Sequence, residues 1–308
     1  MRWDDFRRSD NIEDRRGDGS GGGMLPSGGG FPIRGGHIGI GGLLVLLVLS
    51  WILGINPLAL LGGADFDDGG QTYQAPSGQA PSGSTGTPQD QTAQFVAAVL
   101  GDTEDRWSEI FQANGRNYTP PKLVLFSSVT RSACGTAQSA MGPFYCPNDQ
   151  RVYLDTAFFK MMQTQLHGCQ VGSKACEFSQ AYVIAHEVGH HVQNLLGTLD
   201  KAHRLQSSSG EAAGNRVQVR VELQADCFAG VWANHSEAKW KFLEPGDVEA
   251  ALQTASAIGD DILQKRAQGY AVPDSFTHGT AAQRTHWFTV GLKNGTVESC
   301  DTFSPSQP

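Results

Sequence analysis

Apolar and polar positions divide this chain of 308 residues into four parts. Residues 1–37 interleave acidic residues with arginines and contain runs of glycine. Such a composition cannot bury a core, so we predict a disordered tail. Residues 38–61 are almost entirely apolar, and residues 62–90 form a linker rich in Gly, Ser, Pro and Gln. Periodic apolar patterns typical of a folded domain occupy residues 91–308.

The apolar segment, residues 38–61, has the length of one transmembrane helix, which needs about 20 residues. No charged residue occurs between Arg34 and Asp65. Low-complexity sequence on both sides argues against a buried core helix, and a cleaved signal peptide would begin nearer the N-terminus. Six arginines precede the segment, and no Lys or Arg follows it until Arg106. We therefore expect a single-pass protein of the bacterial inner membrane, with the N-terminus in the cytoplasm and the domain outside.

Helical patterns outnumber strand-like runs within residues 91–308. We predict strands at Lys122–Phe126, Phe144–Cys146 and Arg151–Leu154, the last two forming a hairpin. We predict helices between Phe95 and Phe111, after a cap at Asp155, and over residues 177–196, 212–234, 246–267 and 280–293, with a long polar loop around Ser207–Gly210. The sequence therefore predicts an α+β domain, mainly helical with a small β-sheet.

The helix predicted over residues 177–196 has an apolar stripe at helical spacing. Ser179 is its predicted N-cap and Gly197 its predicted end. The stripe consists of Ala181, Ile184, Ala185, Val188, Val192, Leu195 and Leu196. It would bury the helix, leaving its polar side chains in the core or at the floor of a cleft.

This helix contains one H-E-x-x-H motif, at His186, Glu187 and His190. Residues four apart lie on one helix face, so both imidazoles can bind one metal ion. Glu187 can then reach a metal-bound water without being a ligand. Two hydrogen-bonded core histidines are the alternative, but burying these three polar side chains is costly unless something binds them.

A catalytic zinc needs a third protein ligand and one open position for water. The next predicted helix supplies Glu222 and, four residues later, Asp226. Glu222 can bind the metal, and Asp226 can accept the second ring N–H of a ligand histidine. Two solvated carboxylates are the alternative, although the neighbouring residues in this helix are mostly apolar.

A different zinc ligand set, H-E-x-x-H-x-x-G-x-x-H, does not fit. It requires Gly at position 193 and His at position 196, where the chain has Gln193 and Leu196. His191 lies off the ligand face of the helix, so we interpret it as structural or exposed.

Six cysteines, all beyond the apolar segment, indicate disulfides in a domain outside the cytoplasm. They are Cys134, Cys146, Cys169, Cys176, Cys227 and Cys300. Nearness in sequence favours Cys134–Cys146 and Cys169–Cys176, which leaves Cys227–Cys300, although six cysteines allow about 15 pairings. Free thiols and cysteine ligands to zinc are the alternatives, and the chain contains no C-x-x-C to support a cysteine-rich zinc site.

The E-x-x-A-D at Glu222–Asp226 after an H-E-x-x-H resembles the gluzincin zinc peptidases. A larger set of segments resembles the bacterial family of membrane-anchored neutral zinc metallopeptidases. These segments are residues 9–17, 142–147, 152–155, the His186 helix, 222–230 and 278–280. The resemblance covers nearly the whole chain apart from the linker. It implies a zincin-like metallopeptidase domain with one Zn²⁺ per chain.

The stretch from Phe276 to Arg284 resembles the His…Arg element of HtpX-type membrane zinc proteases. That resemblance implies that His278 and Arg284 lie opposite the zinc. His278 would donate a hydrogen bond to the developing oxyanion, and Arg284 would orient a carboxylate or the substrate backbone. A helix N-cap region at Thr277–Thr280 beside a surface arginine is the alternative interpretation.

The sequence as a whole favours a zinc metalloendopeptidase that acts on peptide or protein substrates. A short strand near Phe144–Cys146 or Val152–Leu154 can pair with an extended substrate backbone. The alternative is a membrane-tethered binding or scaffold protein with a structural or vestigial zinc. No G-x-S-x-G is present, which disfavours a serine hydrolase. The chain has a net charge of −8 and no basic patch with interleaved aromatics, so we do not expect nucleic acid as a partner.

Overall fold

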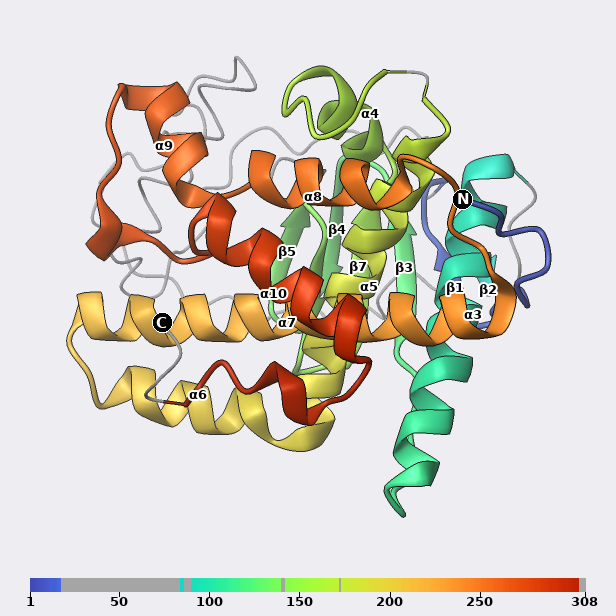
Figure 1. The fold of residues 1–308 in the computed structure, drawn as a ribbon, viewed down its shortest axis with the longest axis horizontal. Coiled ribbons are helices and arrows are strands. Elements are labelled where there is room, and N and C mark those ends of the chain that lie inside the picture. Colours follow the sequence, from blue (N-terminus) through green and yellow to red (C-terminus); the bar gives the residue numbers. More distant parts are fainter. Residues whose placement is uncertain (18–83, 86–89, 140–141, 172, 305–308) are drawn as a thin grey trace, which may run out of the picture.

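The structure, a computed structural model, describes residues 1–17, 84–85, 90–139, 142–171 and 173–304. A layer of helices packs against a small β-sheet (Figure 1). The predicted class, α+β and mainly helical with a small sheet, is confirmed for these residues. Most large buried side chains belong to one core that joins the sheet to the helices.

The main sheet has five strands in the order β2-β1-β3-β7-β6. Strands β1, β3 and β7 are parallel, while β2 and β6 run antiparallel to their neighbours at the two edges. The bounds are β1 Ile12–Asp14, β2 Ser84–Thr85, β3 Lys122–Phe126, β6 Phe144–Cys146 and β7 Arg151–Asp155. The predicted strand at Lys122–Phe126 and the predicted hairpin of β6 and β7 are confirmed. A second hairpin, β4 Val129–Ser132 with β5 Gly135–Gln138, was not predicted.

Two long helices, α5 Ala175–Leu196 and α7 Glu211–Trp240, pack against each other, and α10 Ala281–Asn294 lies along α7 (Figure 1). The remaining helices are α3 Gln91–Ala113, α4 Ala157–Thr164, α6 Thr198–Ser207, α8 Asp247–Ala257 and α9 Asp260–Gln268, with short 3-10 turns at η2 Pro273–Ser275 and η3 Glu298–Cys300. Helix α5 contacts α3, α7 and α8 as well as β6 and β7. It is therefore the central element of the fold.

The predicted helices are present, with shifted boundaries. Helix α5 ends at Gly197 as predicted, in a left-handed conformation with φ 75°. Ser179 is not its N-cap, because the helix begins four residues earlier and Ser179 is fully buried within it. The loop predicted around Ser207–Gly210 is short because α6 occupies the residues before it. The single helix predicted over residues 246–267 is two helices, which separate at Gly259.

The prediction of a disordered tail is wrong for residues 1–17. Strand β1 lies inside the sheet, between β2 and β3. Met1, Phe6 and Ile12 are buried in the main core. The charged residues that made this segment look disordered have specific partners, since Glu13 pairs with Arg15 and with Arg151 of β7.

The predicted transmembrane helix, residues 38–61, and most of the predicted linker lie outside the described residues. Of the helices that the structure does describe, none is long and apolar enough to cross a membrane. Strand β1 is hydrogen-bonded to β3, so residues 1–17 fold together with the domain. The predicted topology, with the N-terminus in the cytoplasm and the domain outside, stays a prediction.

Gly101 of α3 allows a direct test of how the N-terminal segment packs. A Cβ atom at Gly101 would lie 2.2 Å from the carbonyl oxygen of Arg7. We expect Gly101→Ala to lower the free energy of unfolding by roughly 1–3 kcal/mol, because the segment must move away from α3. Urea unfolding of the full chain measures this, and proteolysis within residues 1–17 should accelerate.

Gly214→Ala is the matched control, since a Cβ atom at Gly214 in α7 would have no neighbour nearer than 3.9 Å. Alanine is favoured over glycine in a helix by about 1 kcal/mol, so this variant should be as stable as the parent or more stable. Equal stabilisation by both substitutions would show that residues 1–17 do not pack on α3.

Candidate metal centre

Helices α5 and α7 present the polar side chains of the predicted site to each other. His186, Glu187 and His190 come from α5, and Glu222 and Asp226 come from α7. A Cβ atom at Gly189, inside the H-E-x-x-H motif, would lie 3.0 Å from the carbonyl oxygen of Ala225. The absence of a side chain at Gly189 therefore lets the two helices approach closely enough for these residues to meet.

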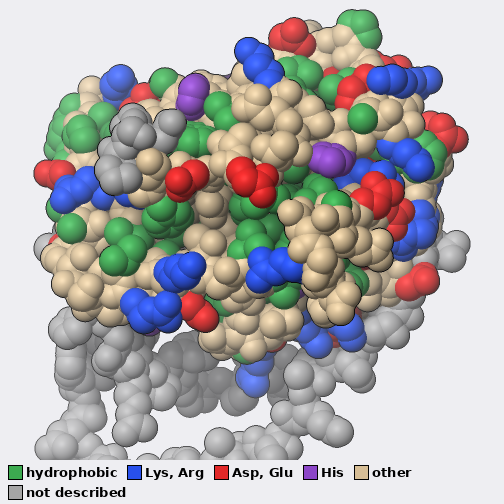
Figure 2. Space-filling model, turned by 60° about the horizontal axis from the view of Figure 1, so that its bottom comes forward, with side chains coloured by type: hydrophobic (Ala, Val, Ile, Leu, Met, Phe, Trp, Pro, Cys, Tyr) green, Lys and Arg blue, Asp and Glu red, His purple; other side chains and the backbone are tan. Residues whose placement is uncertain are grey.

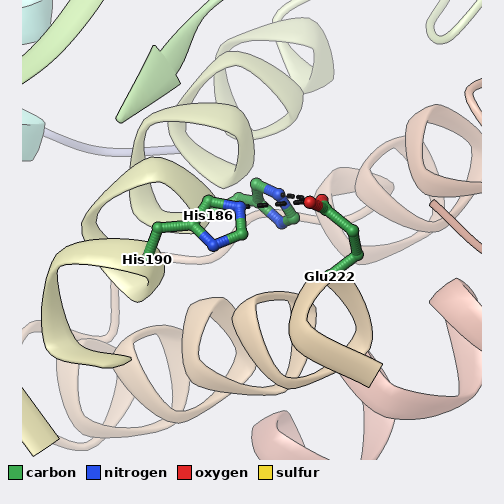
Figure 3. A group of neighbouring side chains, drawn as sticks. All are labelled: His186, His190 and Glu222. Carbon is green, nitrogen blue, oxygen red and sulfur yellow. Dashed lines mark hydrogen bonds and ion pairs between the residues drawn. The ribbon is translucent and has the colours of Figure 1, made fainter. Parts of the chain in front are cut away.

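Three of these side chains converge on one point (Figure 3). Nε2 of His186 lies 3.2 Å from Oε2 of Glu222, and Nε2 of His190 lies 3.6 Å from the same oxygen. One ligand atom from each residue lies within 4.8 Å of the other two. Two ligands of a tetrahedral zinc with bonds of about 2.0–2.1 Å are roughly 3.3–3.4 Å apart. Two of the three separations are close to that spacing, and the donor set of two imidazole nitrogens and one carboxylate oxygen suits a zinc ion.

The charges at this point also suit a cation. Burial favours the protonated form of Glu222, but the charge of His190 and hydrogen bonds with both imidazoles hold its pKa well below the usual range. Burial likewise acts to lower the pKa of His186, but Asp226 and Glu222 outweigh it and raise that pKa to about 10. The two carboxylates thus attract positive charge, which a divalent cation would supply in exchange for imidazole protons.

Asp226 is fully buried and accepts hydrogen bonds from three side chains. Nδ1 of His186 lies 2.9 Å from Oδ1 of Asp226, and the hydroxyl of Tyr182 donates to the same oxygen at 2.5 Å. Arg284 of α10 donates to both carboxylate oxygens, at 2.8 and 2.9 Å. Burial raises the pKa of Asp226, but Arg284 and His186 outweigh it and bring the pKa to about 2. The ionised carboxylate fixes Nδ1–H of His186, so Nε2 faces Glu222.

Arg284 forms an ion pair with Asp226, at 2.8 Å between Nε and Oδ2, and its expected role in the reaction stays a prediction. Its side chain is almost fully buried, so it is not a surface arginine. Nη2 of Arg284 also donates to the hydroxyl of Tyr182, at 3.3 Å. The cluster of Asp226, Arg284, Tyr182 and His186 joins α5, α7 and α10 below the ligand point.

Glu187 is 7% exposed and lies beside the three converging side chains, in the same cleft. Burial raises the pKa of its carboxyl group, while the nearby imidazoles His186 and His190 act in the opposite direction. No hydrogen bond ties it to another described side chain at the ligand point. The carboxylate is thus placed to accept a proton.

His278 lines the same cleft from the turn before α10, together with Asp260. Its Nδ1 lies 3.2 Å from Oδ1 of Asp260, whose other oxygen accepts the backbone N–H groups of residues 277–279. Burial acts to lower the pKa of His278, but the hydrogen bond to Asp260, together with the charges of Glu222 and Asp260, outweighs it and raises the pKa. Asp260 therefore favours a protonated His278. The turn is followed by a helix capped at Thr280, as the alternative interpretation anticipated, while the role of His278 at an oxyanion stays a prediction.

The cleft above these residues has a volume of about 640 Å³. Its walls are largely apolar and include Phe144, Phe158, Met161, Leu166 and Leu263. On the face shown in Figure 2, Lys and Arg side chains are scattered among acidic and apolar ones and form no continuous basic patch. The cleft thus suits an uncharged, partly apolar ligand better than a polyanion.

Several supporting residues were missed by the sequence analysis. Tyr182, Gln193 and Gln218 each lie three or four positions from a motif residue on the same helix, so helical spacing carried a signal for them. Gln193 Oε1 lies 2.9 Å from Nδ1 of His190, and Gln218 donates to Oε1 of Glu222 at 2.8 Å. Asp260 carried no such signal, because it lies 18 residues from its partner His278.

The remaining predicted residues lie outside the ligand point. His191 is fully buried and bonded to Tyr145 and to the carbonyl of Thr119, and burial lowers its pKa to about 4, which fits a structural role. All three favoured disulfides are confirmed, Cys134–Cys146, Cys169–Cys176 and Cys227–Cys300. The alternatives of free thiols and of cysteine ligands to zinc are wrong.

Comparison with known proteins identifies the family. The model of the family described as "Putative neutral zinc metallopeptidase" matches residues 1–303. The chain belongs to this family. The match begins at residue 1, so strand β1 is part of the region that the family shares.

Two relatives support the assignment. The chain is 46% identical to the "Uncharacterized protein YpfJ" of Escherichia coli (strain K12) over 306 residues, which cover 99% of this chain and 100% of the relative. It is 40% identical to an "Uncharacterized protein" of Mycobacterium tuberculosis (strain H37Rv) over 265 residues, 83% of this chain and 85% of the relative. No solved structure matches the chain, so the zincin-like fold stays a prediction.

Replacing Arg284 tests how far the fold depends on the buried cluster. We expect Arg284→Met to lower the free energy of unfolding by about 3–5 kcal/mol, because it leaves the Asp226 charge buried without its cationic partner. Denaturant unfolding of the full chain measures the change.

Arg216→Met is the control, since Arg216 is 63% exposed and its nitrogen lies 3.5 Å from the exposed carboxylate of Asp274. Its loss should change stability by no more than about 0.5 kcal/mol. If both arginine variants unfold alike, the cluster does not carry the stability assigned to it.

Proposed function

We propose that this protein is a zinc metalloendopeptidase that hydrolyses peptide bonds with an activated water. The observation that carries the proposal is the convergence of His186, His190 and Glu222 at the floor of an open cleft, with Glu187 beside them. The family description supports the coarser statement, a zinc metallopeptidase. A structural zinc would not need an adjacent free carboxylate or an open cleft, which disfavours the scaffold alternative.

One zinc per chain, held by His186, His190 and Glu222, would lower the pKa of a water molecule and polarise the scissile carbonyl. Glu187 accepts the proton of the attacking water and transfers it to the leaving amine. Protonated His278 donates a hydrogen bond to the oxygen on which negative charge develops. Asp226 keeps the imidazole of His186 in the tautomer that leaves Nε2 free for a ligand bond.

The edge strand β6 supports an extended substrate. It pairs with β7 on one side and is the last strand of the described sheet. Residues of β6 line the cleft, so their backbone groups can pair with a peptide lying above the ligand point. Apolar walls around that peptide favour apolar side chains next to the scissile bond.

Glu187→Gln tests the assigned base. We expect kcat to fall by at least about 100-fold, because the amide cannot accept the proton. Zinc content and unfolding free energy should stay at the parent values, since Glu187 is not a ligand. Quenched fluorogenic peptides with apolar residues are the substrates, and a chelator should abolish the parent activity until zinc is restored.

Glu177→Gln is the matched control, because Glu177 lies in the first turn of α5, away from the cleft. It should retain parent activity. His278→Gln, in the same assay, should lower kcat with little change in KM, as expected for a contact made in the transition state. Full zinc occupancy without peptide cleavage by the parent protein would favour the scaffold alternative.

We further propose that the domain and residues 1–17 both lie outside the cytoplasm. Three disulfides support an oxidising compartment. The pairing of β1 with β3 supports placing residues 1–17 on the same side as the domain. A single span of the inner membrane by residues 38–61, with the N-terminus in the cytoplasm, is the alternative that the sequence predicts. Single thiols placed at the exposed positions Asp5 and Lys293 should both react with a membrane-impermeant maleimide in intact cells. If only Lys293→Cys reacts before lysis, the proposal is wrong and the N-terminus lies in the cytoplasm.

A further inference from the structure

The two imidazoles of the ligand point have different partners on their second ring nitrogens. His186 faces the ionised carboxylate of Asp226, whereas Nδ1 of His190 faces Oε1 of Gln193, at 2.9 Å. Gln193 is fully buried and lies one turn after His190 on α5. A neutral amide, not a carboxylate, is therefore the neighbour of the second ligand histidine.

An amide can present either its oxygen or its nitrogen to an imidazole, and the surroundings of Gln193 decide which. Its Nε2 donates to the backbone carbonyl of Val221 at 2.8 Å and to Oε1 of Gln224 at 3.1 Å. A backbone carbonyl only accepts hydrogen bonds, so the nitrogen of Gln193 must face Val221. Its oxygen is thereby left facing His190.

Gln224 is fixed in the same way. Its Nε2 donates to the backbone carbonyl of Cys300 at 2.9 Å, which leaves its Oε1 to accept from Gln193. Cys300 is joined to α7 by its disulfide with Cys227. Two backbone carbonyls, at Val221 and Cys300, therefore set the direction of both buried amides.

We infer that Gln193 is a positioning residue for the metal centre, whose oxygen accepts Nδ1–H of His190 and so presents Nε2 as the ligand atom. The inference rests on the proposed zinc site. Gln193 acts through His190 and touches neither substrate nor the reacting water. The two histidines thus have different partners. His186 bonds to the carboxylate of Asp226, which is paired with Arg284, whereas His190 bonds to the amide of Gln193, which donates to Gln224.

The test compares two substitutions with opposite effects on the acceptor. Gln193→Met keeps the length of the side chain but removes the amide. Gln193→Glu keeps an oxygen that can accept from His190, and its protonated carboxyl group keeps one donor for the carbonyl of Val221. The zinc dissociation constant of the full chain is measured by competition with a chromogenic chelator, and the d–d absorption of the cobalt-substituted protein reports the ligand geometry.

We expect Gln193→Met to weaken zinc binding by about 10–100-fold and to alter the cobalt spectrum. Gln193→Glu should stay within about threefold of the parent protein, because it retains the acceptor, and should keep the parent spectrum. Denaturant unfolding of both variants after zinc removal shows whether each one folds. If one variant does not fold, the zinc affinity of the other variant tests the inference.

The outcomes separate the inference from the function on which it rests. Equal weakening by both substitutions would show that Gln193 only supports packing between α5 and α7. Parent-like zinc affinity in Gln193→Met would likewise overturn the inference and leave the peptidase proposal standing. A parent protein that folds but binds no zinc would overturn both.

Discussion

The buried carboxylate of Asp226 is the constraint on which the site depends. An ionised carboxylate in a protein core is strongly destabilising unless it is paired and hydrogen-bonded. Here it accepts from His186, Tyr182 and Arg284, which come from α5 and α10, while Asp226 itself lies on α7. The three helices must therefore keep one relative position for this charge to be tolerated. That same position brings His186 and His190 to Glu222.

The buried carboxylates of Glu222 and Asp260 each have hydrogen-bond partners within the protein. Glu222 is held on one oxygen by Gln218, which leaves its other oxygen directed at the two imidazoles. Asp260 accepts three backbone N–H groups and the ring of His278, so the turn before α10 is ordered around one carboxylate. These bonds within the protein help to orient the ligand atoms.

The sequence predicted which side chains lie together at the site better than the contacts that support them. His186, His190 and Glu222 were found because helical spacing of four places polar side chains on one face, and burial makes such side chains informative. Glu222, the third of these side chains, was found in the next predicted helix, residues 212–234. Asp260 was not found, because a contact between residues 18 positions apart depends on how two helices pack, which no local pattern encodes. The break between α8 and α9 was also missed, because the helical pattern of apolar residues continues through it.

The N-terminal strand was missed because composition was averaged over residues 1–37. Residues 1–17, the part of that range that the structure describes, carry apolar side chains buried in the core and charged groups with partners in the sheet. Residues 15–121 separate β1 from β3 along the chain, but the entropy of closing a loop grows only as the logarithm of its length. Doubling such a loop costs about 0.6 kcal/mol, less than the burial of one side chain such as Ile12 contributes. A domain can therefore begin before a long low-complexity segment and continue after it. In this chain, β1 supports β3 and, through the Glu13–Arg151 pair, β7, the strand that holds the cleft edge β6.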